Sequence, residues 1–145
     1  MRLFRLLLPI LIPLAGLPAT AVAHEGLHLH QPWIREAPPG AEVMAGYVVV
    51  HNPDAIPHVL VGASSPGFAK AMLHQTRETN GVATMVHLKR IEIPAGKAIA
   101  FAPGGYHIML MKPKHHYQAG DKVPVTLRFA DGETLTASFV VRKGQ

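Results

Sequence analysis

Histidine and methionine alternate in the stretch GYHIMLM, which runs from Gly105 to Met111. Successive side chains of an extended strand point to opposite faces, so His107, Met109 and Met111 would share one face. Imidazole nitrogens and thioether sulfurs both bind metals, and neutral thioethers favour the soft ion Cu(I) over Zn(II), Mg(II) or Ca(II). The stretch therefore predicts part of a copper site.

A second set of donors surrounds Asn80-Gly81, a pair typical of a two-residue hairpin loop. If this pair forms the loop, His74 lies opposite His87, and Met85 becomes a diagonal neighbour of His74 on the same face. Joining this hairpin to the first strand would supply two imidazoles and at least two thioethers. Residue pattern alone leaves the exact ligand set open.

The composition supports metal binding and excludes thiol chemistry. The 145 residues include ten histidines and six methionines but no cysteine, which excludes a thiol nucleophile, a disulfide and a blue-copper site. The net charge of +5 comes from scattered basic residues, so we expect no nucleic-acid partner. No acidic or tyrosine constellation accompanies the donors, and we therefore expect a protein that is not an enzyme.

The first residues are typical of a secretory signal peptide. Two arginines precede a short apolar run, and small residues follow up to Ala23, where we place the cut, with a cut after Ala21 as the alternative. The apolar run is too short to span a bilayer comfortably, and we expect no transmembrane segment in the mature chain. We predict residues 1–23 as signal peptide and residues 24–145 as an exported, periplasmic domain.

The mature chain has the pattern of an all-β protein. Short apolar stretches alternate with turn signals such as Pro38-Pro39-Gly40 and Asp131-Gly132, a spacing typical of a β-sandwich or barrel in a single domain. At most one helical turn is expected, at Phe68–Met72. The nine expected strands are Leu27–Arg35, Ala45–Asn52, His58–Ala63, Ala69–Thr76, Val82–Arg90, Ala98–Ala102, Tyr106–Lys112, Val123–Ala130 and Thr134–Arg142.

The spacing of four donors is specific. Ten residues separate His74 from Met85, twenty-one separate Met85 from His107, and one separates His107 from Met109. This order resembles the His-x10-Met-x21-His-x-Met signature of the periplasmic copper chaperone PCu(A)C family. Further matching motifs cover nearly the whole mature chain, among them Trp33-Ile34-Arg35, Ala45-Gly46-Tyr47, Ile93-Pro94-Ala95-Gly96 and Pro103-Gly104-Gly105-Tyr106-His107.

The resemblance implies a fold, a site and a role. The fold would be a cupredoxin-like β-barrel, and the role delivery of copper towards the dinuclear copper centre of cytochrome c oxidase. The acceptor would be an oxidase subunit or another assembly factor, and we expect the carrier to be a monomer. The resemblance assigns four Cu(I) ligands, His74, Met85, His107 and Met109. It leaves open whether His87 or Met111 also touches the metal.

A further candidate site lies at the mature N-terminus, which reads HEGLHLH. His24 would offer a free amine and an imidazole, His28 and His30 share one strand face, and such nitrogen donors suit Cu(II). The main alternative function is therefore a copper-resistance or buffering protein that binds Cu(II) here, by analogy with CopC-like proteins. Two further functions stay open, a copper oxidase or monooxygenase and a metal-free interaction module. We interpret His51 and His58 as surface polar residues.

Overall fold

The computed structural model describes residues 26–144, so the predicted signal peptide and His24 lie outside the described residues. Within this range the chain contains strands and no helix, and no helix long and apolar enough to cross a membrane is found there. The strands are β1 (His28–Arg35), β2 (Val43–His51), β3 (His58–Ser64), β4 (Phe68–Thr79), β5 (Val82–His87), β6 (Ile91–Ile93), β7 (Ala98–Phe101), β8 (Tyr106–Pro113), β9 (Lys122–Phe129) and β10 (Thr134–Arg142).

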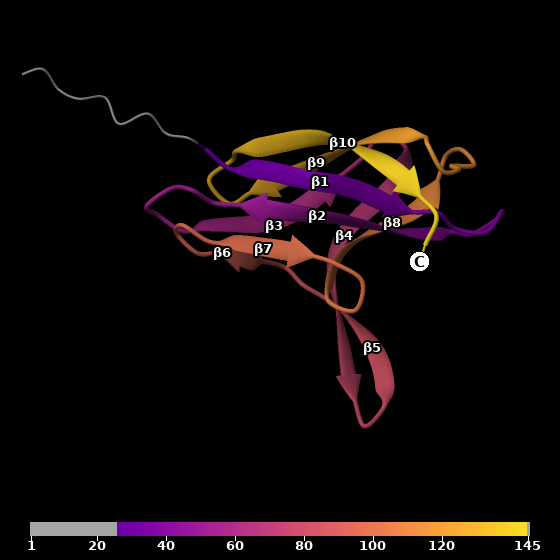
Figure 1. The fold of residues 1–145 in the computed structure, drawn as a ribbon, viewed down its shortest axis with the longest axis horizontal. Helices are drawn as coiled ribbons and strands as arrows, with labels where there is room; N and C mark the ends of the chain where they lie inside the picture. Colours follow the sequence, from indigo (N-terminus) through magenta and orange to yellow (C-terminus); the bar gives the residue numbers. More distant parts are fainter. Residues whose placement is uncertain (1–25, 145) are drawn as a thin grey trace, which may run out of the picture.

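The strands form one sheet that closes on itself as a barrel (Figure 1). The ring of pairings runs β4, β8, β2, β1, β10, β9 and β3, and β3 returns to β4. Strands β5, β6 and β7 extend this ring along β4, β3 and β2. The predicted all-β, single-domain architecture is confirmed.

Strand alternation separates the core from the outer face. Ile108 and Leu110 of β8 are fully buried, as are Val50 of β2 and Leu127 of β9. Each such side chain contributes about 1.5–3 kcal/mol by leaving water. Their neighbours along β8 therefore face away from the barrel interior. The buried face predicted from the GYHIMLM stretch is confirmed for its two aliphatic residues, which fix the strand that carries His107.

Two details of the elements go beyond the sequence analysis. The stretch Phe68–Met72, for which at most one helical turn is expected, has none, because Phe68 begins β4 with a buried ring that packs on Tyr117, with ring centres 5.4 Å apart. The strand expected at Val82–Arg90 ends at His87, and Ile91–Ile93 pairs separately with β3 as β6. Between them, the Leu88 N–H donates to the Leu73 carbonyl at 2.8 Å, which draws the chain back to β4.

The hairpin of β4 and β5 projects from the barrel (Figure 1). Asn80 and Gly81 have φ angles of 52° and 77°, the left-handed conformation that a tight hairpin loop requires. His74 pairs with His87 and Thr76 pairs with Met85. The register predicted from the Asn80-Gly81 signal is confirmed, and it carries one half of the candidate site.

Candidate metal centre

Strand pairing brings the two predicted halves of the site together. In the antiparallel ladder of β4 and β8, His74 lies directly opposite His107, and Met72 lies opposite Met109. Directly opposed residues present their side chains on the same face. The two imidazole centres are 5.7 Å apart, and β5 adds Met85 next to Thr76 on the other side of β4. Three strands thus contribute donors to one face.

The two imidazoles are buried and lack partners. His74 is 8% exposed and His107 is 5% exposed. Neither Nδ1 nor Nε2 of His74, nor Nε2 of His107, has a hydrogen-bond partner within the described part of the chain. Nδ1 of His107 lies 3.4 Å from the Gly105 carbonyl oxygen, a long contact. Buried polar atoms are nearly always satisfied, so these free nitrogens fit a site that a metal ion completes.

The thioethers lie nearer the surface. Met85 is 62% exposed, so its thioether sulfur is accessible to solvent. Met85, His107 and Met109 share a hollow of about 330 Å³. Its remaining lining comes from Arg35, Glu36, Ala37, Pro38, Val43, Met44 and Ala45. The thioether sulfurs of Met85 and Met109 therefore lie on the solvent side of the two buried imidazoles.

Burial also tunes the protonation of the site. The pKa of His74 lies below its ordinary value of 6.5. Burial is the largest cause, and the nearby imidazoles of His107 and His87 lower the pKa further. Burial penalises the charged imidazolium, and positive neighbours penalise it further. His74 therefore stays neutral, with a nitrogen lone pair free for a metal, to a lower pH than an ordinary histidine.

We expect the metal-free protein to lose stability as pH falls below about 6.5. In the window between the lowered pKa and 6.5, the unfolded chain binds a proton at His74 that the folded chain does not, so the free energy of unfolding rises with pH. Chemical denaturation of wild type and His74→Leu between about pH 5 and 8 tests this. The stability of the variant relative to wild type should increase towards low pH, and a pH-independent difference would contradict it.

Three further side chains occupy the donor face. His87 is exposed, and its ring centre lies 5.6 Å from that of His74. Met72, which strand alternation places on the face of His74, lies opposite Met109. Met111 pairs with Lys70 and so lies further from His107 than Met109 does. Apart from the four donors, His87 and Met72 are thus the histidine and methionine that pair directly with one of them in these ladders.

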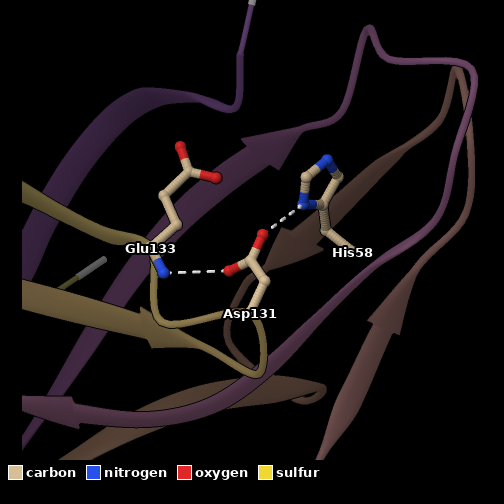
Figure 2. A group of neighbouring side chains, drawn as sticks. All are labelled: His58, Asp131 and Glu133. Atoms are coloured by element: carbon tan, nitrogen blue, oxygen red, sulfur yellow. Dashed lines mark hydrogen bonds and ion pairs between the residues drawn. The ribbon is translucent and has the colours of Figure 1, made fainter.

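His58 is not the surface residue that the sequence suggested, because it is 8% exposed. Its Nε2 lies 2.8 Å from an oxygen of Asp54, and its Nδ1 lies 3.7 Å from an oxygen of Asp131. Figure 2 shows Asp131 directed towards His58 while also accepting the Glu133 backbone N–H at 2.9 Å. Ligand atoms of His58, Asp131 and Glu133 lie within 4.8 Å of one another. Because carboxylates face both imidazole nitrogens, we interpret the group as a polar link between β3 and the β9–β10 turn.

The described N-terminal histidines lie elsewhere on the barrel. His28 pairs with His51 across β1 and β2, and His30 lies two residues further along β1. The structure thus adds His51 to a group that sequence analysis built from His24, His28 and His30. Sequence analysis missed His51 because its place beside His28 depends on the pairing of β1 with β2, and no local sequence pattern specifies that pairing.

Comparisons with known proteins agree with this fold. The family model described as "Putative lipoprotein LpqE-like" matches residues 27–141. The "Putative lipoprotein Lxx21020" of Leifsonia xyli subsp. xyli is 37% identical over 142 residues, which cover 92% of this chain and 84% of that protein.

Two solved structures show the same barrel. The copper-bound PCuAC domain from PmoF2 superposes with a TM-score of 0.69 at 23% identity, over 81% of this chain and 93% of the domain. The solution structure of CuI-DR1885 from Deinococcus radiodurans gives a TM-score of 0.64 at 30% identity, over 87% of this chain and 83% of that protein. The fold is therefore the expected cupredoxin-like barrel, and the chain belongs to the PCu(A)C family of copper-binding chaperones.

Proposed function

We propose that this protein carries Cu(I) in the periplasm and passes it towards the dinuclear copper centre of cytochrome c oxidase. The proposed ligands are His74, Met85, His107 and Met109. The observation that carries the proposal is the pair of buried imidazoles, which have three nitrogens without partners and lie beside exposed thioether sulfur. Leaving such nitrogens unsatisfied costs about 1–3 kcal/mol each, a cost that a bound metal removes.

The donor set favours Cu(I) over divalent ions. Thioethers are soft and imidazoles are borderline ligands, and both are neutral, so they leave a monovalent ion with a single charge to accommodate. A divalent ion would favour an anionic ligand, and none of the four donors is anionic. The lining of the hollow contains one carboxylate, Glu36, which accepts the Ala119 N–H at 3.0 Å. The related CuI-DR1885 from Deinococcus radiodurans, solved with CuI, supports the same oxidation state.

The exposed edge of the site favours transfer. Met85 belongs to the projecting hairpin and is largely accessible, so an acceptor can approach the copper from that side (Figure 1). Thioethers bind without losing a proton and hold Cu(I) less tightly than thiolates do, so copper moves downhill to an acceptor that contains cysteines. The signal-peptide pattern and the lipoprotein names of the relatives support export to the periplasm.

Anaerobic X-ray absorption of the protein loaded with less than one equivalent of Cu(I) should count two sulfur and two nitrogen neighbours, from the two methionines and two histidines. The matched control replaces Met85 and Met109 together by leucine, which keeps side-chain volume and removes both sulfurs. This variant should lose the sulfur signal while its circular dichroism stays unchanged. A wild-type spectrum without sulfur would refute the proposed ligands.

A further inference from the structure

Three histidines gather where β1 and β2 pair: His28, His30 and His51, here called the three-histidine cluster. His28 and His51 are directly paired, and His30 lies opposite Val49. The three distances between ring centres are 6.3, 6.4 and 6.2 Å. Each imidazole is therefore about equally far from the other two, as the corners of a metal site would be.

The backbone holds this cluster on the outer face of the barrel. Val48 and Val50 of β2 are 1% and 0% exposed, so the alternate positions, Val49 and His51, face outwards. A bulge in β1 follows His30, and Gln31 takes a left-handed φ of 50° there. Because a bulge adds one residue, it keeps the histidines outside while Ile34 still enters the core at 0% exposure.

The three rings lie slightly farther apart than the rings around a bound ion would. Three nitrogens at about 2.0–2.1 Å from one metal place their ring centres about 5 Å apart. The observed separations exceed this by roughly 1 Å, a gap that rotation about χ1 and χ2 can close. His28 and His30 are exposed and His51 is half-buried, so the rings have space to rotate. The paired backbone meanwhile holds the three Cα atoms in place.

The chemistry of the cluster differs from that of the His/Met site. It offers imidazole nitrogen alone, without thioether, and such donors bind Cu(II) most tightly among divalent first-row ions, ahead of Zn(II). The two sites are also separate. From Ala45, which pairs with Met109, β2 advances six residues to His51, or ~20 Å at about 3.3 Å per residue.

We propose that His28, His30 and His51 form a second metal site, which takes Cu(II) with water completing the coordination. The site goes beyond the proposed Cu(I) carrier, and it differs from the N-terminal site expected from sequence because a β2 residue supplies the third ligand. A barrel-held site of this kind would collect oxidised copper at a distance from the Cu(I) ligands.

Cu(II) titration against glycine as competitor, with pulsed electron paramagnetic resonance to count bound imidazoles, tests the second site. We expect His51→Ala to weaken Cu(II) binding by about tenfold or more and to lower the imidazole count by one. The matched control replaces His115 and His116, two exposed histidines outside the cluster, by alanine. The control should bind Cu(II) as wild type does.

A wild-type affinity and imidazole count in His51→Ala would overturn the proposal, since Cu(II) would then bind to the N-terminal segment without β2. Folding of His51→Ala is checked by its Cu(I) affinity at the distant His/Met site, which should be unchanged. If that affinity falls, the experiment is repeated with His51→Gln in place of His51→Ala. Glutamine keeps a polar side chain of similar size. Because the Cu(I) and Cu(II) measurements use different ligands, either proposal can fail alone.

Discussion

Alanine in place of His107 should weaken Cu(I) binding by about 100-fold or more. Losing a residue that merely supports a metal ligand typically costs 10–100-fold, and losing a ligand should exceed that range. His107 is the proposed ligand that connects the two parts of the site. It lies opposite His74 in the β4–β8 ladder and also lines the hollow with Met85 and Met109. Its loss leaves one imidazole and two weakly binding thioethers.

His87→Ala is the matched control for this measurement. His87 lies on the same face and opposite the same histidine, but it is exposed, and its alanine variant should change affinity less than about tenfold. Competition with a chromophoric Cu(I) chelator under anaerobic conditions gives both affinities. Equal losses in the two variants would make His87 a ligand as well, whereas an unchanged affinity in His107→Ala would show that the ligand assignment is wrong.

Local sequence patterns predicted those parts of the site that neighbouring residues determine. Asn80-Gly81 specifies a tight loop, and a two-residue loop fixes every pair along the hairpin, including His74 with His87. Alternation in β8 likewise separates Ile108 and Leu110 from the donors. The pairing of β4 with β8 has no such local signal, because the paired residues His74 and His107 lie 33 positions apart in the sequence. The residue types suggested joining the hairpin and the β8 strand into one site, and the family resemblance assigned His74 and His107 to a single set of ligands.

The surroundings of the other histidines depend on closure of the barrel. His51 precedes a turn and His58 follows it. A residue beside a turn is ordinarily exposed to solvent. His58 is buried because the β9–β10 turn returns against β3 and brings Asp131 to it. His51 gains two histidine neighbours because β1 pairs with β2 in one particular register. Neither register follows from a pattern within a single strand, so both environments were missed.

Leucine in place of His74 should stabilise the metal-free protein by about 1–3 kcal/mol while removing its response to copper. Both ring nitrogens of His74 are buried without a partner in the described structure, and leucine removes this unsatisfied pair while filling much of the same space. In wild type, Cu(I) at 100 times its dissociation constant should add about 2.7 kcal/mol to the free energy of unfolding. His74→Leu should gain far less, since it lacks one nitrogen donor.

Chemical denaturation of wild type and variant at neutral pH, with and without anaerobic Cu(I), measures both effects. His87→Leu is the matched control: its imidazole is exposed, so no desolvation cost is relieved, and copper should still stabilise it. If His74→Leu proved less stable than wild type without metal, the His74 nitrogens would have a stabilising partner, such as an ordered water. A stabilised variant that no longer responds to copper would mean that the metal-free fold bears an energetic cost at His74, which copper binding offsets.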